Sequence, residues 1–151
     1  MPQLLRRYFA LPREVRSAYW TLAASVPRMA RALKRKGLRE LLDRTRETTQ
    51  PQSQPHDVPA FARAAARALA IVQHFGPYRG ACLSRSMALW AYLLEHGIES
   101  EIRIGSRITD GAYDGHAWVE LDGRVLNDAA DVADRYRPFD RAVGGPGSPT
   151  A

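Results

Sequence analysis

The sequence has little cysteine and no long hydrophobic run. Its 151 residues include one cysteine, Cys82, which excludes an internal disulfide and fits a reducing compartment. No apolar stretch approaches the roughly 20 residues needed to cross a bilayer, so stable membrane insertion is not expected. Residues 1–16 have no continuous apolar core before their arginines, unlike a signal peptide. We therefore expect a cytoplasmic protein.

Motifs for metal and nucleic-acid binding are also missing. One cysteine and four scattered histidines give no zinc-ligand spacing, so no metal and no other cofactor is expected. The formal net charge is +6, yet no zinc-finger, RRM or helix-turn-helix signature supports a nucleic-acid partner.

The positive charge is concentrated at the N-terminal end. Residues 1–46 carry 12 Lys/Arg and 3 Asp/Glu, a formal charge of +9, whereas the remaining residues carry −3. Two interpretations stay open. The charges form the solvated faces of helices, or they meet an acidic surface of a partner.

Proline positions and apolar spacing divide the chain into four parts. Residues 1–46 are predicted to be a basic helical segment, with separate helices over 3–11, from Pro12 and from Pro27. The remaining parts are a linker with three prolines at 47–59, a folded domain at 60–140, and a Gly/Pro-rich disordered tail at 141–151.

The predicted domain at 60–140 has an α+β pattern. Two amphipathic helices end at Gly76 and Gly97, and a strand of alternating apolar residues follows the second one. Residues 109–115 have turn composition, and residues 116–128 read as a β-hairpin. We expect the helices to pack on a small antiparallel sheet.

Cys82 stands at the predicted start of the second of these helices, directly after Gly80 and Ala81. A free cysteine is usually a small buried hydrophobic residue. At a helix start, however, unpaired N–H groups and the helix dipole favour the thiolate, which is the nucleophilic form. A catalytic thiolate also needs a histidine and a group that orients it.

The hairpin can supply both groups if its register is right. A two-residue loop at Asp122-Gly123 places His116 and Asp128 on opposite faces, whereas a three-residue loop over 121–123 places them directly opposite one another. The three-residue loop also pairs Glu120 with Arg124, so we predict that loop.

The candidate catalytic triad is therefore Cys82, His116 and Asp128. Cys82 attacks an acyl carbon, His116 moves the proton, and Asp128 orients the ring. The backbone N–H of Cys82 is the expected first oxyanion donor, and Tyr78 is a candidate for a substrate-binding role beside it. Trp118, on the predicted face of the pair, is either a shield against water or an ordinary core residue.

The stretches "CLSRSMALWAYLLEHGI", "IRIGS" and "GHAWVELDGRVLND" together resemble the catalytic domain of lasso-peptide leader peptidases. These enzymes belong to the transglutaminase-like cysteine protease superfamily. The resemblance covers about residues 60–140 and implies a transglutaminase-like or papain-like core. It also implies that Cys82, His116 and Asp128 have the triad roles.

The resemblance further implies a role in peptide maturation. The expected substrate is the leader of a ribosomally synthesised precursor, or RiPP. The expected partners are a small leader-binding protein, known as a RiPP recognition element, and the lasso cyclase. The basic segment 1–46 is then expected to contact the leader or its binding protein.

Other classes of function stay open. A transglutaminase-like acyltransferase would pass the acyl group to an amine, and a non-catalytic module would only hold the leader. A peripheral membrane protein could use the basic helices to bind anionic lipid.

Overall fold

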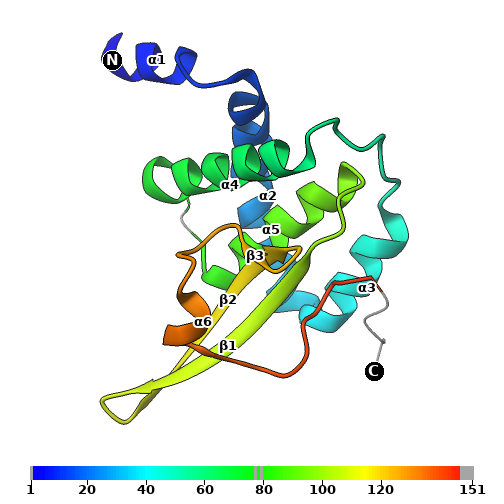
Figure 1. The fold of residues 1–151 in the computed structure, drawn as a ribbon, viewed down its shortest axis with the longest axis vertical. Helices are drawn as coiled ribbons and strands as arrows, with labels where there is room; N and C mark the ends of the chain where they lie inside the picture. The colour runs from blue at the N-terminus through cyan, green and yellow to red at the C-terminus, as the bar shows by residue number, and fades with distance from the viewer. Residues whose placement is uncertain (1, 77, 79, 147–151) are drawn as a thin grey trace.

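The computed structural model describes residues 2–76, 78 and 80–146. Within them the chain forms helices followed by a small antiparallel sheet (Figure 1), which confirms the predicted α+β class. The helices are α1 (Pro2–Phe9), α2 (Arg13–Lys36), α3 (Leu38–Thr48), α4 (Val58–Phe75), α5 (Cys82–Glu95) and α6 (Val132–Arg135). The strands are β1 (Glu101–Thr109), β2 (Ala112–Leu121), β3 (Arg124–Val125) and β4 (Arg137–Pro138), in the order β3-β2-β1-β4.

Helix α2 corrects the prediction of a helix boundary at Pro27. The helix runs from Arg13 to Lys36 without a break, and Pro27 lies inside it. A proline removes one helical hydrogen bond, but tertiary packing of the residues before it can hold the helix together. Leu22 and Val26 supply that packing, since both are fully buried.

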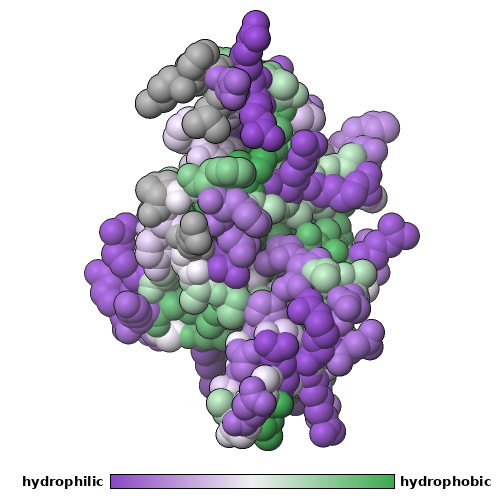
Figure 2. Space-filling model, turned by 90° about the vertical axis from the view of Figure 1, so that its left-hand side faces the viewer, coloured by the Kyte–Doolittle hydropathy of each residue, from purple (hydrophilic) through white to green (hydrophobic). Residues whose placement is uncertain are grey.

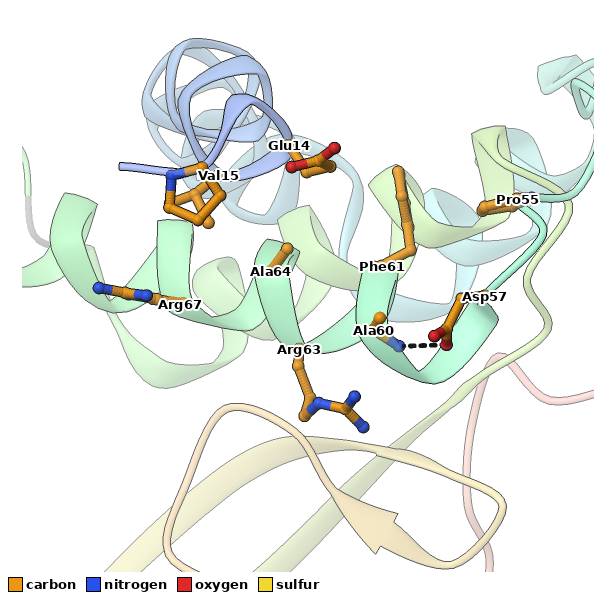
Figure 3. Close-up of a pocket in the computed structure, with 10 residues that line it drawn as sticks. Glu14, Val15, Pro55, Asp57, Ala60, Phe61, Arg63, Ala64 and Arg67 are labelled. Carbon is orange, nitrogen blue, oxygen red and sulfur yellow. Dashed lines mark hydrogen bonds between the residues drawn. The ribbon is translucent and has the colours of Figure 1, made fainter. Parts of the chain in front are cut away.

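The main core lies between the helices and one face of the sheet. Helix α5 packs against α2 and α4 on one side and against β1 and β2 on the other. Its apolar residues are almost all buried, as in a helix that is covered all round. Asp57 caps the start of α4: its Oδ1 accepts a hydrogen bond of 2.9 Å from Ala60 N (Figure 3).

Strands β1 and β2 form a long ribbon that extends beyond the helices (Figure 1). The predicted turn over 109–115 is wrong in extent, because only Asp110-Gly111 turn and β2 already begins at Ala112. The alternation of Ile102 and Ile104 predicted β1 correctly, and Ile102 is fully buried.

The space-filling view shows mostly hydrophilic residues over the lower part of the molecule, with hydrophobic areas between them (Figure 2).

The predicted three-residue loop of the second hairpin is also wrong. Leu121 pairs with Arg124 and Glu120 pairs with Val125, so the loop has two residues, Asp122 and Gly123. The ladder is short: Leu126 N still donates to Val119 O at 2.9 Å, but the chain then leaves the strand.

Parts of the predicted linker and of the predicted tail are held by hydrogen bonds to α5 and β1. Gln52 N donates to Glu95 O at 2.8 Å, which places part of the predicted linker against the end of α5. In the predicted tail, Val143 and Ile102 exchange two backbone hydrogen bonds, and Gly144 O accepts from Trp90 Nε1 at 3.0 Å. The final part of that tail, residues 147–151, lies outside the described residues. In the described part of the chain, no helix is both long and apolar enough to span a membrane.

Candidate active site

Helix α5 begins at Cys82, as the sequence predicted. Ala81 before it is extended, and its carbonyl accepts a hydrogen bond of 2.9 Å from Ser84 Oγ, which tightens the first turn. The first turn holds no acidic residue, so no carboxylate of that turn opposes a negative charge on the sulfur. The Cys82 side chain is partly buried at the edge of the main core.

Gly80 sets how closely the start of α5 approaches α2. A Cβ at this position would lie 2.6 Å from Val26 Cγ1 and 2.9 Å from Ser84 Oγ, so a larger residue would push the two helices apart. The Gly80 carbonyl accepts a hydrogen bond of 2.7 Å from Arg85. The ring of Tyr78 lies against Gly80, with 43% of the residue exposed, so it stands near the start of α5.

His116 and Asp128 are hydrogen-bonded to one another. The distance from His116 Nε2 to Asp128 Oδ2 is 2.5 Å, and only about a fifth of each side chain is exposed (18% and 20%). The two residues thus meet although the predicted register is wrong. They meet because the chain leaves the ladder after Leu126, so the alternation of faces no longer applies at Asp128.

Asp128 is surrounded by hydrogen-bond donors. Burial acts to raise its pKa, but the hydrogen bonds from His116, the backbone N–H of Ala129 and Arg135 together outweigh burial and hold the pKa below its usual value. The carboxylate is therefore ionised at neutral pH and can only accept, so the proton in the 2.5 Å bond belongs to His116 Nε2. Nδ1 is then the unprotonated nitrogen of the neutral ring.

Two aromatic rings lie against the imidazole. The ring of Trp118 is stacked at 6.0 Å between centroids, and that of Tyr136 is stacked at 4.6 Å. Trp118 is completely buried in a small second core with Val132 and Tyr136, on the opposite face of β2 from α5. The predicted position of Trp118 beside the histidine agrees with this packing.

Sequence reasoning missed Tyr136 and the groups that hold it. Tyr136 follows α6, and its hydroxyl donates to Asp114 Oδ2 at 3.0 Å, while Arg107 Nε donates to the same oxygen at 2.8 Å. The hydrogen bond from Arg107, followed by that from Tyr136, lowers the pKa of Asp114. Burial and the bond to Asp114 raise the pKa of Tyr136. No motif marks Tyr136, because its position depends on a short helix that has no apolar periodicity.

The structure thus brings two of the three triad candidates together. Within the described part of the chain, the thiol of Cys82 has no hydrogen-bond partner. Helix α5, which carries Cys82, packs on β2, which carries His116. The His116 ring itself lies with Trp118, on the face of β2 away from α5. Ser86, one turn after Cys82, donates to the carbonyl of Ala117, the residue that follows His116, at 3.0 Å.

Other candidate sites are separate from this one. A groove of about 470 Å³ lies between the start of α2 and α4 (Figure 3). Val15 of α2 and Phe61 and Ala64 of α4 line it, together with Arg63 and Arg67 of α4. None of the triad residues lines it. Among the described residues, no three His, Cys, Asp or Glu side chains gather closely enough to hold a metal ion.

Comparisons with known proteins agree with the predicted fold class. The sequence profile of the transglutaminase-like superfamily matches residues 20–141, which include all three triad candidates. A curated relative, the microcin J25-processing protein McjB of Escherichia coli, is 37% identical over 67 residues. That match covers 44% of this chain and 31% of the relative. No solved structure matches the chain.

Proposed function

The chain belongs to the transglutaminase-like superfamily, and from this premise we propose that it is a cysteine peptidase that removes the leader from a lasso-peptide precursor. The observation that carries the proposal is the His116–Asp128 hydrogen bond, on the strand against which the Cys82 helix packs. The resemblance to a protein that processes microcin J25 supports a ribosomally made peptide as the substrate.

In the proposed mechanism, His116 Nδ1 takes the proton of the Cys82 thiol. The sulfur attacks the carbonyl carbon of the scissile peptide bond and forms a tetrahedral intermediate. The ring then gives the proton to the leaving nitrogen, the C–N bond breaks, and a thioester of the leader remains on Cys82. Water attacks the thioester while His116 takes a proton from the water. The C–S bond then breaks, His116 returns the proton to the Cys82 sulfur, and the leader leaves with a new carboxylate.

Asp128 and the start of α5 support these steps. Because the ionised Asp128 holds the proton on Nε2, it keeps Nδ1 available as a base and stabilises the imidazolium that forms. The backbone N–H of Cys82 is the proposed donor to the oxyanion, since the first N–H groups of a helix have no partner within it. Trp118 and Tyr136 restrict the access of water to the ring.

The proposed partners follow from the same function. A small leader-binding protein presents the precursor, and the lasso cyclase uses the core peptide after its N-terminal amine is freed. The basic residues of α2 form a candidate contact with acidic groups of the leader or its binding protein. No cofactor takes part in the mechanism.

The test is to incubate the chain with the precursor and the leader-binding protein and to measure product masses. The wild type should give two fragments whose masses sum to the precursor plus one water, and Cys82→Ser should give none. Unchanged cleavage by Cys82→Ser would refute the thiolate mechanism.

The superfamily match also favours a second candidate, an acyltransferase that passes the acyl group to an amine. The same spectra separate the two reactions. Aminolysis would give a leader fragment that has gained the amine acceptor in place of water.

A further inference from the structure

We propose that Ser86 and Asn127 are positioning residues that fix the three triad elements relative to one another. The inference rests on the proposed function, because it assigns these residues a role in the peptidase site. Neither residue touches the reacting atoms in the proposed mechanism. Ser86 instead lies one turn after Cys82 on α5, and Asn127 directly precedes Asp128 in the chain.

The two side chains form one continuous set of hydrogen bonds. Ser86 Oγ donates to Ala117 O at 3.0 Å and accepts from Asn127 Nδ2 at 3.2 Å. Asn127 Oδ1 in turn accepts from Val119 N at 2.7 Å. The backbone N–H of Val119 can only donate, which fixes the amide with Oδ1 on the strand and Nδ2 on Ser86.

These bonds take the place of strand pairing. In an antiparallel sheet, alternate residues direct their backbone groups to opposite edges. Ala117 and Val119 direct theirs away from β1, toward the side where β3 has ended. If β3 were longer, its backbone would pair with the carbonyl of Ala117 and the N–H of Val119. The side chains of Ser86 and Asn127 bind these two groups instead.

The set joins the three elements of the triad. Ser86 lies one turn after Cys82 on α5, Ala117 follows His116 on β2, and Asn127 precedes Asp128 in the loop. Ser86 is fully buried, so its bonds are shielded from competition with water. A shift of the helix start, the strand or the loop relative to the others would break at least one bond.

The effect on catalysis follows from this arrangement. Misplacing a reacting group by about 1 Å can cost roughly 10²-fold in rate. We expect Ser86→Ala and Asn127→Ala to lower kcat for precursor cleavage by about that factor. KM should stay close to its wild-type value, because neither side chain is placed to bind the leader.

Ser100 offers a matched control. It is also a buried serine, 2% exposed, but its hydroxyl has no hydrogen-bond partner among the described residues. Ser100→Ala should keep the wild-type kcat. If Ser100→Ala lowers kcat as much as Ser86→Ala, the loss reflects general loosening of the core and the proposal is overturned.

The closing experiment uses alkylation of Cys82 by iodoacetamide, because it needs no substrate. With one cysteine in the chain, the mass shift of the intact protein reports on Cys82 alone. The rate is measured against pH for the wild type, Ser86→Ala, Asn127→Ala, the double variant, Ser100→Ala and His116→Ala. Near-ultraviolet circular dichroism and thermal midpoints show which variants are folded, and only folded variants are compared.

Positioning predicts that both single variants take on the pH profile of His116→Ala, and that the double variant is no worse than the more affected single one. Wild-type pH profiles in folded Ser86→Ala and Asn127→Ala would overturn the proposal. If Ser86→Ala does not fold, the result for Asn127→Ala decides, because Asn127 is only half-buried. A wild type that cleaves no precursor would refute the proposed function alone, since the alkylation profiles still decide whether the residues position the thiol and imidazole.

Discussion

Two hairpins share β2 and have the same turn, yet they end differently. Both close with Asp-Gly, and all four turn residues have positive φ: 51° and 77° at Asp110-Gly111, 50° and 75° at Asp122-Gly123. The first hairpin pairs from Thr109–Ala112 along the whole ribbon to Glu101–Glu120. The second has paired only Leu121–Arg124 and Glu120–Val125 before its ladder ends.

In both hairpins the turn sets the register, and the residues that follow decide how far strand pairing continues. Strand β1 alternates isoleucine with polar residues, which suits a pleated sheet. After Val125 the chain reads Leu-Asn-Asp-Ala-Ala-Asp, and Asn and Asp are poor strand formers. The chain therefore leaves the sheet where its side chains form the His116–Asp128 pair, so the interrupted hairpin is the one that builds the site.

The largest expected effect comes from the carboxylate beyond the short hairpin. Asp128→Asn keeps the shape of the side chain but removes the charge that holds the proton on His116 Nε2. We expect kcat for precursor cleavage to fall by about 10²–10⁴-fold. Asp131→Asn is the control, since Asp131 is exposed and, among the described residues, its carboxylate pairs only with Arg135. Equal kcat values for wild type and Asp128→Asn would show that the short hairpin does not build a catalytic pair.

The same variant should also change how the stability of the fold depends on pH. Because the pKa of Asp128 is lowered in the folded state, the unfolded chain binds more protons in the acid range, so this group stabilises the fold fully above its unfolded pKa of about 3.9. The contribution is lost as pH falls through the lower, folded pKa. The stability difference between wild type and Asp128→Asn should therefore shrink on acidification. Urea unfolding at several pH values measures it, and a difference that grows toward acid would contradict the sign.

The two turn glycines give a smaller effect and a direct comparison of the hairpins. A Cβ at Gly111 or Gly123 meets no atom within 4 Å, so alanine at either position costs only the left-handed backbone, about 1–2 kcal/mol. Both variants should lose similar stability in urea unfolding. Only Gly123→Ala should also lower kcat, because its turn leads to Asp128. Equal kcat values for the two variants would mean that the second turn does not govern the site.

The smallest effect is expected at Tyr136. Tyr136→Phe keeps the ring against His116 but removes the 3.0 Å hydrogen bond to Asp114. We expect only a small loss of stability in urea unfolding and no change in kcat. The pKa of Asp114, followed by NMR titration, should rise but stay below its usual value, because Arg107 is the larger cause of its lowering. A large fall in kcat would assign the hydroxyl a role in the reaction.

Local patterns predicted most of the fold. The helix starting at Cys82 and the strand through Ile102 and Ile104 follow from apolar spacing and from Gly80 before the helix. The break that was expected at Pro27 is absent, because tertiary packing of Leu22 and Val26 holds α2 together. Propensity describes a segment by itself, and such packing is decided by the rest of the chain.

The pair of His116 and Asp128 was predicted through a register that the structure does not have. Counting faces assumes that a strand continues, and here a side chain, Asn127, replaces the backbone as the partner of Val119. Tyr136 could not be predicted, because α6 is four residues long and its place depends on the chain's path after the short hairpin.

The proposed mechanism requires that His116 activates the thiol of Cys82, and the alkylation rate of Cys82 at neutral pH measures this activation. Three proteins suffice: wild type, His116→Ala, and His74→Ala, whose exposed imidazole contacts its own helix at Ala70 O. If His116 activates the thiol, His116→Ala should react about tenfold or more slowly than the other two proteins. Identical rates for all three proteins would contradict it.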